Sequence, residues 1–151
     1  CKGYTQGKGV DYNETFAPLV RHSTMRVILA LFAHYGLFTR HFDIPKAFPQ
    51  ADIGYDCYIK ALVGTTLPPG KCYKLHKSLY GTKQAARMFN QVLSSYSISL
   101  GFTQCTSDSC VYYLQDGDSF VLLVAYVDDI FLAASTQELC DKYAQLFHQR
   151  F

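Results

Sequence analysis

Two adjacent carboxylates interrupt a strongly apolar stretch of this chain. Asp128 and Asp129 follow the apolar run 120–125 and Tyr126-Val127, and Ile130-Phe131-Leu132 comes directly after them. Ionised groups in such surroundings must reach solvent, pair with cations or bind metal, because an unpaired buried charge is costly. A hairpin resolves the conflict, since the flanks can be buried as strands while the acids project at the turn. An Asp-rich turn would ordinarily carry Gly, and this segment has none, which favours a functional site.

A third carboxylate is needed if these acids bind a metal ion. Mg²⁺ prefers six oxygen ligands in octahedral geometry, more than two neighbouring carboxylates supply. Asp43 is the best candidate, because it lies at the end of a strand predicted over 37–44. An isolated Asp at a strand end is ordinarily a turn residue or a helix cap. Its interpretation as a ligand therefore depends on its pairing with Asp128 and Asp129.

The elements that must position these acids alternate between helices and strands. Apolar periodicity and capping residues predict three helices, and short apolar runs bounded by turn residues predict the strands. The helices are expected from Ser23 or Thr24 to Gly36, from about Lys83 to Leu100, and from a capping box formed by Ser135 and Glu138. The strands are expected at 37–44, 56–62, 72–75, 109–115, 119–126 and 130–134, with Asp116-Gly117-Asp118 as a hairpin turn. This order predicts an α+β fold with an antiparallel sheet packed on helices.

The composition sets limits on the class of protein. The chain has 151 residues, 49% of them hydrophobic and 15% aromatic, which suits one domain, 1–151, with a packed core. The net charge of +2 indicates no particular partner. A local basic stretch without acids could bind polyanions or could be a solvated face. It contains Lys71, Lys74, Lys77, Lys83 and Arg87.

The cysteines and the apolar runs indicate an intracellular protein without a membrane span. The six cysteines form no C-x-x-C pair, so zinc is not expected, and free thiols in a reducing compartment are. The longest apolar run, 120–125, is too short to cross a bilayer. The sequence opens at Cys1 without a methionine and stops at Phe151 inside a predicted helix. We therefore expect a fragment of a longer chain.

Several segments together resemble the reverse transcriptase of copia-type LTR retrotransposons. The resemblance covers essentially the whole chain, and its motifs are specific in combination. The matching segments are Lys2-Gly-Tyr-Thr-Gln6, Asp11-Tyr-Asn-Glu-Thr-Phe-Ala-Pro18, Arg21 with Ser23-Thr24 and Arg26, Phe42-Asp-Ile-Pro-Lys-Ala-Phe48, Leu75 to Arg87, Leu100-Gly-Phe102, Ser107-Asp108 and Tyr126-Val-Asp-Asp129.

The resemblance implies a right-hand polymerase fold, of which this chain supplies the palm and part of the fingers. It also implies RNA-directed DNA polymerase activity with two Mg²⁺ ions (Mn²⁺ as the substitute), held roughly 3.5–4 Å apart by Asp43 and Asp128. Asp129 and the Ile44 carbonyl would complete that metal site. The implied nucleotide-binding residues are Lys46, Ala47, Phe48 and Gln84, and the implied nucleic-acid contacts are Tyr126, Lys83 and Arg87. The implied partners are an RNA or DNA template-primer, dNTPs, and the remaining fingers, thumb and RNase H of a Pol polyprotein. The implied location is the cytoplasm, in a virus-like particle, or the nucleus.

This sequence departs from the family pattern at several positions. Pro45 and Lys46 stand where relatives usually have Lys and Thr, and Pro45 removes one amide from the phosphate-facing turn. Ala86 and Phe89 replace a usual Pro and a common Trp, and Pro49-Gln-Ala51 replaces a Leu-Asn-Gly-like turn. The family's triphosphate-binding Lys and Arg are expected before position 1, and its primer grip after Phe151.

Three functions are compatible with these residues. The first is a fragment of an active polymerase, and the second is a degenerate or domesticated remnant that only binds nucleic acid. The third is a metal-dependent phosphohydrolase, which is the weakest because we expect no His and no Ser or Cys nucleophile beside the acids. The intact set of Asp43, Asp128 and Asp129 favours the first, since drift has no reason to spare metal ligands.

Overall fold

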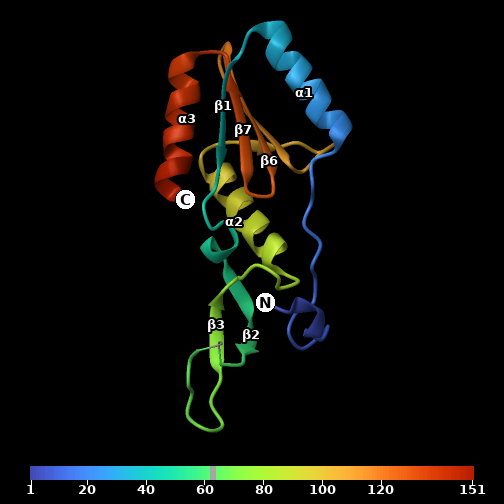
Figure 1. Cartoon of the computed structure of the whole chain (residues 1–151). Coiled ribbons are helices and arrows are strands. Elements are labelled where there is room, and N and C mark those ends of the chain that lie inside the picture. Colours follow the sequence, from blue (N-terminus) through green and yellow to red (C-terminus); the bar gives the residue numbers. More distant parts are fainter. Residues whose placement is uncertain (62–63) are drawn as a thin grey trace. The chain divides into compact units, whose positions relative to one another are not determined.

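The structure, a computed structural model, describes residues 1–61 and 64–151 (Figure 1). It consists of two compact units, residues 1–17 with 48–92 and residues 18–47 with 93–151. The elements in chain order are a 3-10 turn Gly3–Thr5, α1 His22–Tyr35, β1 Phe38–Asp43, a 3-10 turn Phe48–Gln50, β2 Asp52–Ile59, β3 Tyr73–Lys77, α2 Ala85–Ser99, β4 Thr103–Gln104, β5 Val111–Asp116, β6 Ser119–Tyr126, β7 Asp129–Ala134 and α3 Gln137–Arg150. The predicted mixture of helices and antiparallel sheet is confirmed.

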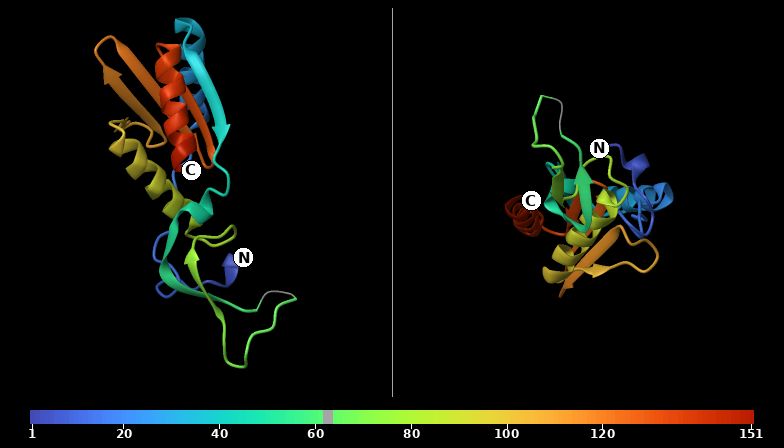
Figure 2. Two further views of the ribbon diagram at one scale, coloured as in Figure 1. Left: turned by 90° about the vertical axis from the view of Figure 1, so that its left-hand side faces the viewer. Right: turned by 90° about the horizontal axis from the view of Figure 1, so that it is seen from below.

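The second unit is built on a five-stranded antiparallel sheet. Its strand order is β1-β7-β6-β5-β4, so β7 lies between β6 and β1. Helices α1 and α3 cover opposite faces of this sheet (Figures 1 and 2). Successive side chains of a strand point to opposite faces, and both faces of this sheet are packed against helices. Phe131 and Ala133 pack in the cluster that contains Phe32 of α1, while the Phe42 ring of β1 lies 6.2 Å from the Phe147 ring of α3.

The helix ends differ from the predicted caps in three places. Helix α1 begins at His22 with Arg21 as its cap residue, not at Ser23 or Thr24, whereas Gly36 ends it in the left-handed conformation as predicted. Helix α2 begins at Ala85, two residues later than predicted. Helix α3 is capped by Thr136, because the Ser135 hydroxyl instead accepts a hydrogen bond from the Phe120 N–H of β6 at 3.1 Å.

A buried carboxylate from a distant loop stabilises the start of α1. Asp108 is 7% exposed, and its carboxylate accepts hydrogen bonds from the backbone N–H of Arg21 and of Cys110, each at 3.1 Å. Burial alone would raise the pKa of Asp108, but these bonds and one from the Thr24 side chain outweigh it and lower that pKa. Asp108 thus does for α1 what a local capping side chain would otherwise do.

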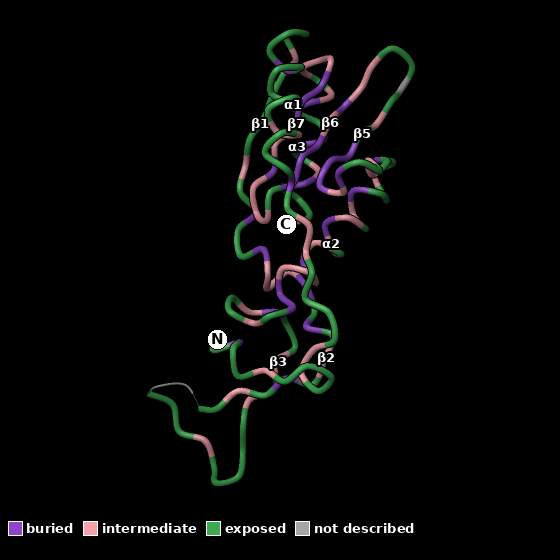
Figure 3. The backbone as a smooth tube through the Cα atoms, turned by 90° about the vertical axis from the view of Figure 1, so that its right-hand side faces the viewer, coloured by how far each residue is buried: buried purple, intermediate pink, exposed green. Residues whose placement is uncertain are grey.

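The first unit contains the antiparallel pair β2 and β3. Strand β2 begins at Asp52, four residues before the predicted start, and its pairing with β3 shifts register between Asp52 and Cys57. Gly54 lies within this shift at a positive φ of 72°, a conformation that few other residues adopt. The predicted end of the strand at Leu62 lies outside the described residues. The described part of the β2–β3 loop is largely exposed (Figure 3).

Two further expectations concern the cysteines and membrane segments. All six cysteines are free thiols; Cys57, Cys110 and Cys140 are buried, whereas Cys1 and Cys72 are exposed. Among the described residues, no helix is both long enough and apolar enough to cross a membrane.

We predict that Asp108→Asn lowers the free energy of unfolding by about 1–3 kcal/mol, because the amide cannot replace a buried carboxylate that accepts several hydrogen bonds. Since the pKa of Asp108 is lowered in the folded state, its contribution is present above the ordinary carboxyl pKa. That contribution is lost as the pH falls through the lowered value. Urea unfolding between about pH 7 and about pH 3 should therefore show a smaller stability loss for the variant than for the wild type.

Asp118→Asn is the matched control, because Asp118 is an exposed acid in the β5–β6 turn. Equal pH dependence for wild type and Asp108→Asn would contradict the assigned role of Asp108.

Candidate active site

The two adjacent aspartates lie at the tip of the predicted hairpin. Tyr126 of β6 pairs with Asp129 of β7, so Val127 and Asp128 form a two-residue turn between the strands. Val127 adopts a positive φ of 59°. The favoured two-residue hairpin turns have positive φ at the first central position, which is usually Gly, Asn or Asp. A β-branched residue in this conformation is strained, and such strain is concentrated at functional sites.

Strand β1 brings the third aspartate to the same end of the sheet. Asp43 is the register partner of Asp129, so the two side chains leave the sheet on the same face with Cβ atoms about 4.5–5.5 Å apart. Beyond the strand, the Ile44 N–H donates to the Asp128 carbonyl at 2.8 Å. The three predicted catalytic residues are therefore neighbours, and the backbone, rather than side-chain packing, fixes their positions.

The donor set suits a hard divalent cation. Asp43 is exposed, and Asp128 and Asp129 are half-buried, so their oxygens are accessible. In the described part of the chain, no three His, Cys, Asp or Glu side chains converge into a group that could hold a metal by itself. Mg²⁺ does not require such a group, because it commonly binds one or two carboxylates and takes its other ligands from water and substrate phosphates. The residues present therefore fit the implied ion in their chemistry.

The turn after β1 holds the first predicted nucleotide-binding residues. Lys46 follows Pro45 and has a positive φ of 53°, and a Pro followed by a positive φ matches the dihedral signs of a type II turn. Within the described chain, Lys46 and Val127 are the only non-glycine residues with positive φ. Each is within three residues of a candidate catalytic aspartate. Ala47 has no exposed surface, so its side chain cannot contact a ligand. The role implied for Ala47 concerns its backbone amide instead.

The other predicted nucleotide-binding residues belong to the first unit. The Phe48 ring packs on Tyr80 at 4.5 Å and near Phe89 at 6.4 Å between ring centroids. Gln84 is fully buried. Its carbonyl oxygen accepts from Gln6 at 3.0 Å, and its amide donates to the Asp11 carbonyl at 3.1 Å. A contact between the Gln84 side chain and a nucleotide would require these bonds to be exchanged.

The predicted nucleic-acid contacts at the start of α2 are joined to the N-terminal arm, residues 1–17. The Lys83 ammonium donates to the Tyr12 hydroxyl at 3.1 Å, and the Lys83 backbone N–H donates to the Gln6 side chain at 2.8 Å. Arg87 forms an ion pair with Glu14 and donates to the Phe16 carbonyl at 3.3 Å. Both cations thus have partners within their own unit. Tyr126, the third predicted contact, is 40% exposed on β6.

His41 belongs to the site and was missed in the sequence. Its Nε2 atom lies 2.9 Å from Oδ1 of Asp129. The spacing could have indicated this, because His41 precedes Asp43 by two residues and therefore shares its face of β1. The expectation that no histidine lies beside the acids is therefore wrong.

Comparisons with known proteins identify the family of this chain. The family model described as reverse transcriptase (RNA-dependent DNA polymerase) matches residues 1–151. A Pol polyprotein from transposon RE1 of Arabidopsis thaliana is 34% identical over 154 residues, covering 100% of this chain and 10% of the relative. One from transposon TNT 1-94 of Nicotiana tabacum is 34% identical over 93% of this chain and 11% of the relative. The chain thus spans about a tenth of these polyproteins. No solved structure matches significantly.

We predict that Val127→Gly is more stable than Val127→Ala by about 1 kcal/mol, because only glycine removes the Cβ that makes a positive φ unfavourable. Both variants lose the same contacts of the valine methyl groups, so the difference isolates backbone strain. Chemical unfolding of the two variants measures it. An alanine variant at least as stable as the glycine variant would contradict strain at this position.

We also predict that Gln84→Met destabilises the chain by about 1–3 kcal/mol, since a side chain of similar length leaves the partly buried partners of the amide unsatisfied. The control is Gln91→Met, because Gln91 is exposed on α2. That change should alter the free energy of unfolding by less than about 0.5 kcal/mol. Similar unfolding midpoints for the two variants would show that the buried network does not stabilise the chain.

Proposed function

The chain belongs to the reverse transcriptase (RNA-dependent DNA polymerase) family, and from this membership we propose that it is the catalytic part of a copia-type retrotransposon polymerase. We assign it to the palm and part of the fingers of a longer Pol polyprotein, as one domain over residues 1–151. The observation that carries the proposal is the strained two-residue turn, which brings Asp128 and Asp129 to the strand end that carries Asp43. An ordinary surface turn has no need of a valine at positive φ.

In this proposal Asp43, Asp128 and Asp129, with the Ile44 carbonyl, hold two Mg²⁺ ions. When bound, these ions would supply Lewis acidity to the primer 3′ hydroxyl and to the triphosphate. The chain's own contribution is positional. The β1–β7 register determines which carboxylates face each other, and the Ile44 N–H fixes the backbone of Asp128.

In this proposal, residues that follow β1 and residues at the start of α2 bind the incoming nucleotide. The amides of Lys46 and Ala47 lie in a turn directly after β1 and would face the triphosphate. The Phe48 ring would limit the space beside the sugar, and its packing on Tyr80 keeps it in one orientation. Gln84 would act through the buried network it organises rather than through a free amide.

The basic stretch 71–87 would not be the main contact with the template-primer. Lys74 pairs with Asp56 at 2.5 Å and Lys77 pairs with Asp52 at 2.7 Å, and Lys83 and Arg87 have partners in the arm. This pairing reduces the positive charge that the sequence gives to the stretch. It weighs against the alternative of a remnant that binds nucleic acid through these cations alone. Tyr126, which is exposed beside the aspartates, is the better-placed contact.

We predict that Asp128→Asn, introduced into the complete polymerase that contains this chain, lowers Mg²⁺-dependent extension of a primed RNA template by about a thousand-fold or more. Losing one anionic metal ligand removes several kcal/mol of transition-state stabilisation. Asp118→Asn, in the turn of the other hairpin, should leave extension unchanged. Extension that survives Asp128→Asn would disprove the metal assignment. A wild-type polymerase that binds the primed template without extending it would support the remnant.

A further inference from the structure

We propose that His41 is a positioning residue for Asp129: its Nε2–H holds one carboxylate oxygen, so that the other oxygen is presented to the metal site. The inference rests on the proposed function and adds a residue to it. The distance of 2.9 Å between Nε2 and Oδ1 is that of a hydrogen bond. A carboxylate can only accept, so the proton of this bond resides on Nε2.

The strand register explains why this contact forms. His41 pairs with Phe131, and Asp43 pairs with Asp129, so all four side chains lie on one face of β1 and β7. The His41–Asp129 contact runs diagonally between these two pairs, a separation that long side chains can span. One residue of slippage would move His41 to the opposite face.

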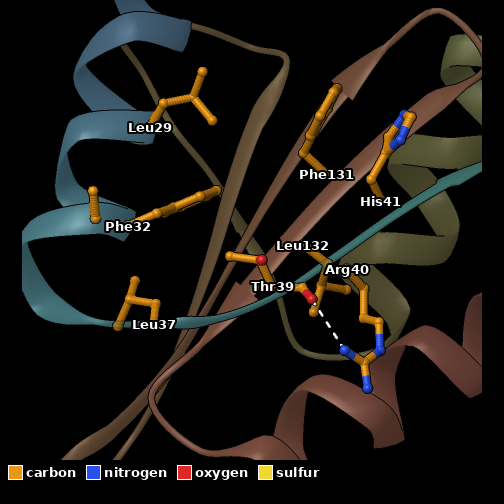
Figure 4. A pocket seen from close by; sticks show the side chains of 9 residues that line it. Leu29, Phe32, Leu37, Thr39, Arg40, His41, Phe131 and Leu132 are labelled. Atoms are coloured by element: carbon orange, nitrogen blue, oxygen red, sulfur yellow. Dashed lines mark hydrogen bonds between the residues drawn. The ribbon is translucent and has the colours of Figure 1, made fainter.

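The face of the His41 imidazole packs against an aromatic ring. The centroids of His41 and Phe131 are 4.3 Å apart, and the ring planes differ by 18°. Figure 4 shows the two side chains projecting side by side from adjacent strands. Phe131 in turn packs against the core cluster that includes Phe32 and Ile28 of α1. The orientation of the imidazole is thereby connected to the core of the second unit.

Electrostatics explains what the contact achieves. Asp43 and Asp129 are like charges directly opposite each other on a strand pair, an arrangement that disfavours pairing. A donor on Asp129 relieves this repulsion and fixes the carboxylate plane. The exposed fractions of the two side chains, 53% and 41%, mean that the bond contributes little to folding. Its effect should therefore appear in the affinity of the site for metal, because partners that orient metal ligands typically change affinity by about 10–100-fold.

The first test uses the 151-residue chain and Mg²⁺ alone. Long-range ¹H–¹⁵N spectra should show the proton of the neutral His41 ring on Nε2. Asp129→Asn should shift that signal. The Mg²⁺ concentration that half-saturates the shift of the Asp129 amide should be about tenfold higher in His41→Phe, which keeps a ring on Phe131 but has no donor. His41→Gln, which restores a donor, should return it to within about threefold of the wild type.

A control separates orientation from general loss of structure. His148 also packs on an aromatic side chain, because its ring centroid lies 4.7 Å from the ring centroid of Phe42. His148→Phe should leave the Mg²⁺ titration unchanged. An Nδ1-protonated His41, or equal Mg²⁺ titrations for wild type and His41→Phe, would overturn the inference.

The second test uses the complete polymerase. His41→Phe should raise the Mg²⁺ concentration for half-maximal extension about tenfold, with little change in the KM for dNTP, and His41→Gln should reverse the effect. If Asp128→Asn abolishes extension while His41→Phe leaves the Mg²⁺ requirement unchanged, the proposed function stands and the role of His41 is wrong. If Asp128→Asn has no effect, the proposed function itself fails.

Discussion

The register of β7 between β6 and β1 is the constraint on which the site depends. Because side chains alternate along a strand, one residue of slippage on either side would turn Asp129 away from Asp43. The two-residue turn at Val127-Asp128 fixes the register with β6, and the Ile44–Asp128 hydrogen bond continues the ladder with β1. The strain at Val127 costs roughly 1–2 kcal/mol. Burial of both flanks, including Leu123, Ile130 and Leu132, offsets it.

Because side chains alternate along the strands, the residues that stabilise the fold are different from those that form the candidate site. The central strands give one set of side chains to α1 and the other to α3, and these contacts form the core of the second unit. At the end of the sheet, one face carries Asp43, Asp129 and His41 instead, and these side chains remain partly exposed. The apolar core can therefore define the positions of polar groups without burying them, which would raise the cost of their charges.

Local patterns predicted the site better than they predicted its surroundings. The hairpin tip and the strand end at Asp43 follow from residues adjacent in sequence. The cap of α1 does not, because Asp108 supplies it from 87 residues away. Similarly, Gln84 is buried by an arm whose Gln6 is 78 residues distant, and a lone polar residue at a helix start gives no sign of this. For His41, the sequence predicts the face of β1 on which it lies, because Asp43 is two residues away. Its contact with Asp129 could not be predicted in this way, because it depends on the β1–β7 register.

The openness of the aspartate site is itself consistent with polymerase chemistry. A protein cage that supplied every metal ligand would leave no position for the phosphate oxygens that must bind during nucleotidyl transfer. In the proposed function, carboxylates on one strand end and one turn would leave such positions to the substrate. In the proposed function, the chain would determine where the ions bind, and substrate phosphates would complete their coordination. Orientation of each carboxylate then matters more than the number of carboxylates, which is why a neighbour such as His41 can influence the site.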